Sequence, residues 1–229
     1  TVLLETLERV APGRVRVERT VWPDNANAAD TVNYTVAFGR QRDQLVQGAH
    51  YDAVPGSPGA NDNGAAVTQL VFAVAALHEA IQNGEPEPDC VFVFFDHEEL
   101  YGTRYMGSLT WAKAHRDETP AAAIVWDVSG SGRLYVSERD PTGLLGHLRT
   151  RETPPSDNLN LERAGIPATL VCALPDDQFR MAYPPAWHSL HRSDDAPDMI
   201  DDATLAAGTR LALDTVARFM AKKQTTVTL

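Results

Sequence analysis

Six side chains of the types that bind divalent metals follow apolar runs or stand in turns of this chain. They are His50, Asp62, Glu98, Glu99, Asp127 and His191. Two imidazoles and several carboxylates are the ligands that a pair of divalent cations needs. A single residue of this kind is common by chance. An ordered series at strand ends and turns indicates a metal-dependent function.

Each of the first two candidates, taken alone, also has an ordinary structural explanation. His50 follows an apolar run, so it could bind a metal through one ring nitrogen while Asp52 holds the other. Taken alone, it is more simply a surface histidine beside a solvated carboxylate. Asp62 stands in the small-residue turn Gly59–Gly64 and could bridge two metals or only cap the helix that follows.

The paired glutamates follow the run Cys90–Phe95, which predicts a strand buried on both faces. Carboxylates in such a place are costly unless something pairs them, although a solvated loop is the alternative. Neighbouring side chains in a loop can diverge, so Glu99 could bind metal while Glu98 acts as a general base. Asp127 follows another apolar run and is either a single-oxygen ligand or a turn cap.

The last candidate lies in the segment from Trp187 to Asp201, where either His188 or His191 could be the ligand. Asp194 or Asp195 could orient that imidazole. His97, beside the paired glutamates, is expected to face outward from its loop rather than to bind metal.

Composition limits the number of domains and the kinds of partner to expect. The 229 residues are 43% hydrophobic and 22% charged, which predicts one globular domain over residues 1–229. The formal net charge of −11 argues against nucleic acid as a partner, since phosphate binding needs basic patches. No apolar stretch approaches the ~20 residues of a membrane span, so neither a membrane partner nor a spanning helix is expected.

Two further observations concern the compartment. Cys90 and Cys172 lie in apolar runs, so buried thiols are favoured over a disulfide or metal ligands. The chain starts at Thr1 without a methionine, so a soluble protein that is secreted or periplasmic after removal of a leader stays open. The sequence does not decide the compartment or the oligomeric state.

Hydrophobic patterning predicts strands that alternate with helices. The expected strands are 15–20, 32–38, 44–49, 90–95, 121–126, 134–137 and 166–172, and the expected helices are 2–9, 65–80, 103–115, 143–149 and 202–222. This alternation is typical of an α/β three-layer sandwich, in which ligands sit beyond the carboxyl ends of the strands. The candidate ligands that follow strands should therefore converge on one crevice.

These motifs together resemble metallopeptidase family twenty-eight, which includes bacterial double-zinc aminopeptidases, glutamate carboxypeptidase relatives and glutaminyl cyclases. The shared pattern is a His-x-Asp after a strand, an Asp in a Gly-Ala-x-Asp-Asn-Gly turn, a Glu-Glu pair, an Asp after the next strand, and a late histidine followed by acidic residues. The resemblance runs from about residue 32 to residue 220.

The resemblance implies an α/β/α sandwich around a mixed, mostly parallel sheet of about eight strands. It also implies one zinc ion held by His50 and Asp127, a second held by Glu99 and His191, and Asp62 bridging both. His191 is preferred because Asp195 lies four residues on and Asp201 ten residues on. His188, the second choice, has Arg192 at the first of these positions.

The chain departs from the family pattern at three positions. His97 stands where the family often has glycine, Asn61 where it has an acidic residue or threonine, and Arg192 where it has threonine or serine. None of these changes removes a proposed ligand.

The function that the resemblance implies is a zinc-dependent aminopeptidase, a hydrolase that acts on peptides through a water bridging two metals, with Glu98 as the base and Asp52 beside His50. A glutaminyl cyclase, which uses one zinc, is the first alternative, although Asn63-Gly64 after the Asp62 turn favours the peptidase. A metal-free binding domain is the second alternative, although such domains lose ligands that this chain keeps.

Overall fold

The computed structural model describes residues 1–23 and 29–227, and within them eight strands form one sheet. The strand order is β1-β2-β4-β3-β5-β8-β6-β7. The strands are β1 Val15–Thr20, β2 Thr31–Phe38, β3 Leu45–His50, β4 Cys90–Phe95, β5 Ala122–Trp126, β6 Arg133–Ser137, β7 Thr150–Arg151 and β8 Ala168–Leu174.

The sheet is mixed, and its centre is parallel. Strand β3 pairs in parallel with both β4 and β5, and β5 pairs in parallel with β8. Antiparallel pairing joins β1 to β2, β2 to β4 and β6 to β8. Because the chain passes from β3 to β4 on one side and later to β5 on the other, the carboxyl end of β3 lies at a switch point, where α/β proteins bind ligands.

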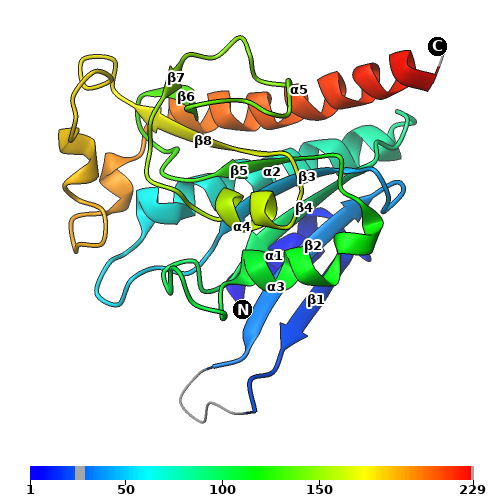
Figure 1. The fold of residues 1–229 in the computed structure, drawn as a ribbon, viewed down its shortest axis with the longest axis horizontal. Coiled ribbons are helices and arrows are strands. Elements are labelled where there is room, and N and C mark those ends of the chain that lie inside the picture. The colour runs from blue at the N-terminus through cyan, green and yellow to red at the C-terminus, as the bar shows by residue number, and fades with distance from the viewer. Residues whose placement is uncertain (24–28, 228–229) are drawn as a thin grey trace.

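Helices cover both faces of the sheet, which makes three layers (Figure 1). Helices α1 (Val2–Val10), α2 (Ala65–Gln82) and α5 (Asp202–Val227) lie on one face, and α3 (Gly107–Ala114) and α4 (Asn158–Arg163) on the other. The described residues also form four short helical turns: η1 Ala60–Gly64, η2 Arg116–Glu118, η3 Pro185–Trp187 and η4 Pro197–Met199.

Strand β4 shows how the sequence builds these layers. Phe92 and Phe94 share a buried cluster with Leu70 of α2, whereas Val93 and Phe95 share another with Trp111 of α3. Successive side chains of a strand point to opposite faces, so a run of six apolar residues supplies both cores. The predicted three-layer α/β sandwich is therefore confirmed.

The helix predicted over residues 143–149 is wrong. The Asp140 carboxylate accepts hydrogen bonds from the backbone N–H groups of Thr142, Gly143 and Leu145, and so closes a turn instead of a helix. Gly143 has a φ of 67°, outside the right-handed helical region. The apolar spacing of the segment reflects two leucines, Leu144 and Leu145, that reach the core from this turn.

Other boundaries shift by local chemistry. The helix predicted from residue 103 begins at Gly107, because residues 99–105 form turns in which Gly102 has a φ of 76°. Strand β7 and helix α4 are only two and six residues long, and their patterns were too short to predict. The last helix extends to Val227.

One segment corrects the expectation about membrane-length apolar stretches. The helical residues Ala60–Gln82 are long and apolar enough, by length and composition alone, to cross a membrane. In the structure this segment contributes Ala66, Leu70 and Val74 to the core that it shares with α5 and the sheet. The core helix of a soluble protein meets the same criteria of length and composition.

Candidate metal centre

The candidate ligands converge beyond the carboxyl ends of three adjacent parallel strands. His50 ends β3, the Glu98-Glu99 pair follows β4, and Asp127 follows β5. Asp62 enters from η1, directly before α2. Register places His50 beside Phe95 of β4, so the ligands of neighbouring strands lie at one level.

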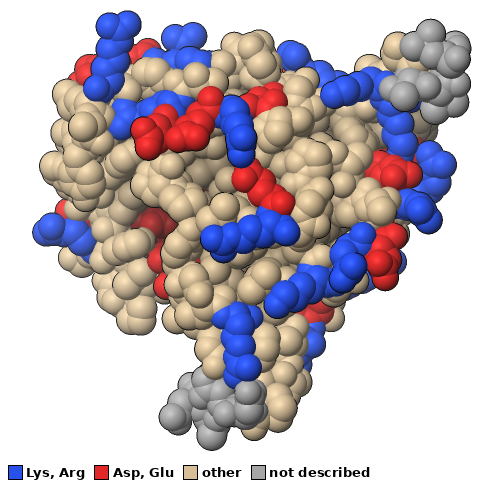
Figure 2. Space-filling view, in the orientation of Figure 1, with Lys and Arg blue, Asp and Glu red and all other residues tan. Residues whose placement is uncertain are grey.

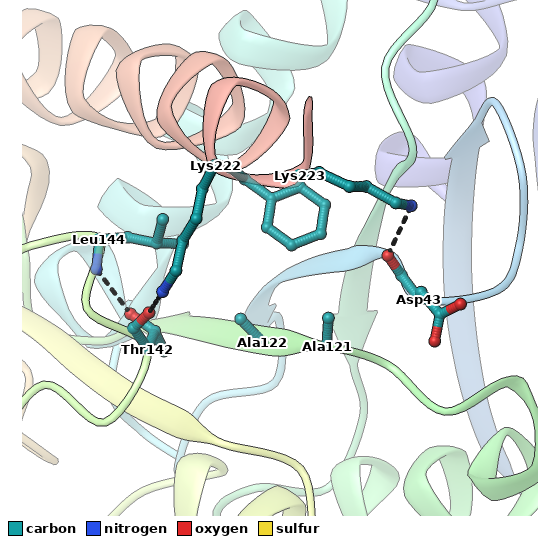
Figure 3. A pocket seen from close by; sticks show the side chains of 8 residues that line it. Asp43, Ala121, Ala122, Thr142, Leu144, Lys222 and Lys223 are labelled. Carbon is teal, nitrogen blue, oxygen red and sulfur yellow. Dashed lines mark hydrogen bonds between the residues drawn. The ribbon is translucent and has the colours of Figure 1, made fainter. Parts of the chain in front are cut away.

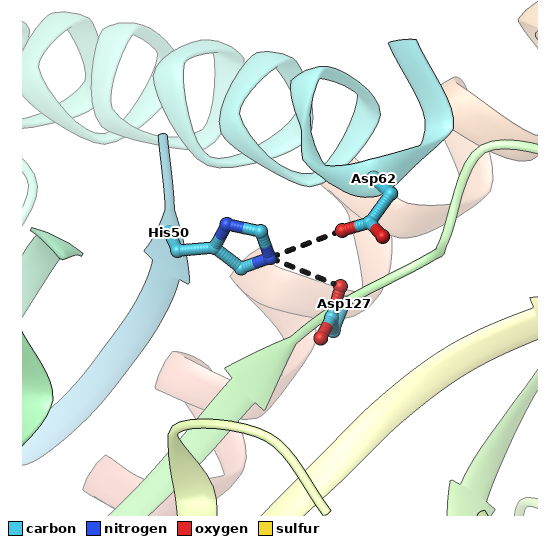
Figure 4. Close-up of side chains that lie close together, drawn as sticks. All are labelled: His50, Asp62 and Asp127. Carbon is cyan, nitrogen blue, oxygen red and sulfur yellow. Dashed lines mark ion pairs between the residues drawn. The ribbon is translucent and has the colours of Figure 1, made fainter. Parts of the chain in front are cut away.

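One group of possible ligands consists of His50, Asp62 and Asp127 (Figure 4). The Nε2 atom of His50 lies 3.2 Å from Oδ1 of Asp62 and 3.4 Å from Oδ1 of Asp127. His50 is 1% exposed, so this group is closed to solvent on the side of the sheet.

A second group consists of Asp62, Glu99 and His191. The Nε2 atom of His191 lies 3.2 Å from Oδ2 of Asp62 and 3.3 Å from Oε2 of Glu99. The two carboxylate oxygens of Asp62 therefore face different groups, Oδ1 toward His50 and Oδ2 toward His191. A carboxylate in that arrangement can bridge two cations.

The turn that carries Asp62 is held by buried side chains. The Asp195 carboxylate accepts hydrogen bonds from the backbone N–H groups of Asn61 (2.8 Å) and Asp62 (3.1 Å). Asn63 donates its side-chain amide to the carbonyl of Trp126, one residue before Asp127, at 2.8 Å. Asp195 thus positions Asp62, whereas the sequence alone leaves Asp194 or Asp195 to orient an imidazole.

Asp52 connects His50 with the glutamate pair. Its carboxylate accepts hydrogen bonds from the backbone N–H groups of Glu98 (3.0 Å) and Glu99 (3.1 Å). Nδ1 of His50 lies 3.1 Å from the backbone carbonyl of Asp52 and 3.5 Å from its carboxylate. A proton on Nδ1 satisfies both acceptors, and this tautomer directs the lone pair of Nε2 toward the acidic groups.

The pKa values reflect an excess of buried carboxylates. Burial raises the pKa of Glu98 to about 9, with further increases from Asp127 and Asp157. Burial and the neighbouring Asp62 raise the pKa of Glu99 to about 7. Burial alone would lower the pKa of His50, but the surrounding carboxylates outweigh it and raise that pKa well above its ordinary value. Bound dications would reverse this by favouring the ionised carboxylates.

Several polar atoms of the centre are buried without a hydrogen-bond partner. They include Nε2 of His50, Oε1 of Glu99 and Oδ1 of Asp127. Buried polar atoms in folded proteins are almost always satisfied, so unsatisfied atoms that converge from separate elements fit a cation-binding site. Nitrogen and carboxylate oxygen donors suit zinc, and the residues present therefore fit a zinc pair.

The two other histidines near the centre do not join either group. His188 is exposed and stacks on Tyr183, with ring centroids 4.9 Å apart. His97 has a φ of 57°, which explains why a glycine suits that position, and its Nδ1 lies 3.3 Å from the Thr31 hydroxyl.

Asp157 belongs to the surroundings of the centre and was not singled out from the sequence. It is fully buried before α4, and both of its carboxylate oxygens lack a hydrogen-bond partner in the structure. Burial raises its pKa to about 7, and the charge of Asp127 adds to that increase. In the sequence, Ser156-Asp157 resembles an ordinary helix start, so only tertiary packing reveals its position.

A pocket of about 380 Å³ opens onto the metal centre. Acidic side chains of the centre line one part of it, and Leu170, Cys172 and Trp187 are among the apolar residues that line the rest. Figure 2 shows acidic side chains inside a hollow on the left side of this face of the molecule. Cys90 and Cys172 are both buried free thiols, as expected.

A second cavity, of about 330 Å³, lies between the end of α5 and the sheet (Figure 3). Its two lysines already have partners. Lys222 donates to the carbonyl of Thr142, and Lys223 donates to the carbonyl of Asp43 and to Asp89. These groups stabilise the chain itself, so the carboxyl ends of the strands remain the better candidate site.

Comparison with known proteins agrees with this geometry. Residues 33–142 match the family model of peptidase family M28. The matched range contains His50, Asp62, the glutamate pair and Asp127, and it ends before His191. No curated protein sequence matches the chain.

Solved structures of similar fold include LapB from Legionella pneumophila, at a TM-score of 0.71 and 19% identity over 95% of this chain and 63% of LapB. A Zn-dependent exopeptidase from Parabacteroides distasonis matches at 0.68 and 17% identity, over 93% of this chain and 87% of its own. A glutaminyl cyclase from Fimbriiglobus ruber matches at a TM-score of 0.68 and 18% identity, over 95% of this chain and 85% of the cyclase. The chain spans less than two thirds of LapB.

At these identities the solved structures establish a shared fold, and the family model matches the part of the sequence that carries most of the candidate ligands. The resemblance expected from the motifs is therefore confirmed: residues 33–142 match the model of peptidase family M28, and the fold is that of solved zinc-dependent peptidases.

Proposed function

We propose that the chain is a zinc-dependent aminopeptidase that removes N-terminal residues from peptides with the help of two metal ions. The observation that carries this proposal is the pair of three-residue ligand groups that share Asp62. A single-metal site would need only one of these groups. The match of residues 33–142 to the model of peptidase family M28 supports the peptidase class, and the exopeptidase from Parabacteroides distasonis has a similar fold.

In this proposal His50 and Asp127 hold one zinc ion, Glu99 and His191 hold the other, and Asp62 bridges them. The unsatisfied Nε2 of His50 and Oδ1 of Asp127 support the first assignment. The distances from His191 to Asp62 and Glu99 support the second. Zinc, when bound, would polarise the scissile carbonyl and lower the pKa of a nearby water.

Glu98 is the proposed general base. Its backbone is fixed by Asp52, and its side chain lines the pocket although it belongs to neither ligand group. It would take a proton from the attacking water and return it to the leaving amine. The surrounding carboxylates would also attract the protonated amine at the start of a peptide, which favours an aminopeptidase.

The pocket next to the centre suits an uncharged side chain. Its lining contains no lysine or arginine, and apart from the acidic centre it is largely apolar, with Leu170 and Cys172 on β8 and Trp187 of η3. We therefore expect apolar residues at the N-terminus of preferred peptides, since burying a charge without a partner is costly.

Glutaminyl cyclase activity is a second candidate, because the cyclase from Fimbriiglobus ruber is covered over 85% of its length at a TM-score of 0.68. A cyclase with one zinc ion would leave one ligand group without a metal. Metal stoichiometry and product therefore separate the two candidates.

The test is a panel of aminoacyl-p-nitroanilides and a peptide that begins with glutamine, each with purified protein in zinc, before and after chelation. We expect chelator-sensitive release of nitroaniline, fastest for apolar residues, and two zinc ions per chain by mass spectrometry. Pyroglutamate formation with one zinc ion would favour the cyclase. Protein that neither binds zinc nor acts on any substrate would contradict both.

A matched pair of variants tests the bridging role. Asp62→Ala should abolish turnover and lower zinc content from two ions to one or none, because both groups lose a ligand. Asp214→Ala, an exposed change on α5, should leave both readouts unchanged. Two retained zinc ions in Asp62→Ala would refute the bridging assignment.

A further inference from the structure

A groove of about 700 Å³ leads away from the pocket of the metal centre. The two hollows share five lining residues: Thr153, Pro154, Pro155, Tyr183 and Trp187. A peptide whose first residue occupies the pocket can therefore continue into the groove without leaving the protein surface. Proline and aromatic side chains along this path offer flat apolar surfaces for its backbone.

Two arginines beside this groove form contacts that hold the segment lining it. Arg149 forms an ion pair of 2.6 Å with Asp176 and lies over the ring of Phe179. Arg151 donates hydrogen bonds to the carbonyls of Phe179 and Met181 and lies 4.9 Å from the ring centroid of Trp187. These contacts explain the fixed position of the segment between β8 and η3.

Arg180, which lies between those anchored residues, is different. It is exposed, it lines the groove, and it has no ion pair or hydrogen bond within the part of the chain that the structure describes. Glu152 is the single acidic residue in the groove lining, so Arg151 and Arg180 leave the lining positive in a chain of net charge −11. An unpaired guanidinium in such a place is suited to a carboxylate.

The pocket of the metal centre is acidic, and the groove next to it is basic. Carboxylates surround the metal centre, where the N-terminal amine of a peptide would lie, and the unpaired cation lies in the adjoining groove. A short peptide carries the same charges in the complementary order, with its amine at one end and its carboxylate at the other. The match is with the leaving part of the substrate, beyond the bond that is cut.

We propose that Arg180 binds a carboxylate on the leaving side of the substrate, so that the enzyme prefers short peptides with a negative charge there. This inference rests on the proposed aminopeptidase function. The carboxylate could come from the C-terminus of a tripeptide or from an acidic side chain at the same distance from the cut bond.

The experiment compares kcat/KM for leucyl-glycyl-glycine, its C-terminal amide, and the amide of leucyl-glycyl-aspartate. We expect the neutral amide to be about fivefold poorer than the free acid, mainly through KM, which is the upper range for an exposed ion pair. Recovery by the aspartate amide would identify a side-chain carboxylate as an equal source, and failure to recover would identify the C-terminus.

Variants assign the effect to Arg180. In Arg180→Gln the ratio of free acid to amide should fall to about one, and Arg180→Lys should restore part of it. Arg210→Gln, an exposed change on α5 outside the groove lining, should keep the wild-type ratio. About 0.5 M sodium chloride should also reduce the wild-type ratio, since exposed charges are screened.

Equal kcat/KM for all three peptides, or an unchanged ratio in Arg180→Gln, would overturn the proposal while hydrolysis itself upheld the aminopeptidase function. No hydrolysis of any peptide by zinc-loaded protein would overturn both.

Discussion

Strand β4 has a buried carboxylate near each end, and the two differ in their partners. Asp89, directly before the strand, is 5% exposed and pairs with Lys223 of α5 at 2.7 Å and with Arg40 at 3.0 Å. Glu98, just beyond the other end, is 8% exposed, and no ion pair joins it to a cationic side chain within residues 1–23 and 29–227.

The pKa values move in opposite directions. Burial would raise the pKa of Asp89, but Lys223 and Arg40 outweigh it and lower that pKa to about 2. Burial raises the pKa of Glu98 to about 9, because nearby carboxylates add to the increase and His50 offsets only part of it. A buried charge is tolerated when it is paired, so the amino end of the strand is completed by the chain itself. At the carboxyl end His50 is the cationic partner from the chain, and carboxylates outnumber it there.

The largest effect is expected from Glu98→Gln, which removes the base and keeps the shape of the side chain. Turnover should fall by about 10²- to 10⁴-fold, the usual contribution of a general base. Zinc content should stay at the wild-type value because Glu98 is not a proposed ligand. Glu138→Gln, an exposed change, is the control. Turnover that survives in Glu98→Gln would remove this residue from the mechanism.

At the other end of the strand, Asp89→Asn should destabilise the fold by about 2 kcal/mol at neutral pH, because Lys223 loses its buried partner. Since the folded pKa of Asp89 lies below its ordinary value, its contribution should be lost as the pH falls from about 4 to about 2. Urea denaturation across this range measures it. Asp30→Asn, which breaks the exposed pair with Arg19, should cost far less.

Asp157→Asn is expected to stabilise the metal-free protein, whereas Asp89→Asn destabilises it. The folded pKa of Asp157, about 7, lies above its ordinary value, so the ionised carboxylate costs stability that grows between about pH 4 and pH 7. The variant should therefore be more stable than wild type by about 4 kcal/mol at about pH 8 and nearly equal to it at about pH 4. A less stable variant at the higher pH would contradict the cost assigned to buried carboxylates around the centre.

The smallest effect is expected from His115→Gln. This imidazole is positively charged, and so can form ion pairs, only when it is protonated at low pH. His115 lies 2.9 Å from Glu18 and 2.9 Å from Glu118 and stacks on Trp111. Burial opposes protonation, but the two glutamates raise the pKa of His115. Its stabilisation should be full below about pH 6.5 and lost as the pH rises through the folded pKa.

Thermal unfolding of His115→Gln should therefore show a loss of about 1 kcal/mol at acidic pH and little loss at about pH 9. His147→Gln, an exposed change, should show no such dependence. An equal loss at both pH values would indicate packing rather than charge.

The sequence predicted most of the sheet because its strands carry their own signal. Cys90–Phe95 is apolar throughout, which a strand between two helical layers requires. It failed at residues 143–149, where Asp140 competes with the helix for backbone N–H groups. It also missed α4 and β7, since two to six residues carry too little pattern.

The sequence alone determined the fold class, the resemblance to peptidase family M28 and the residue types that converge, because apolar periodicity and ligand chemistry are local properties. Tertiary structure decided how these residues divide into two groups, with one oxygen of Asp62 toward each. It also decided that Asp195 holds the Asp62 turn, that Asp157 lies buried beside the centre, and that Arg180 lines a groove from it. These are distances between segments far apart in the chain, and such distances follow only from packing.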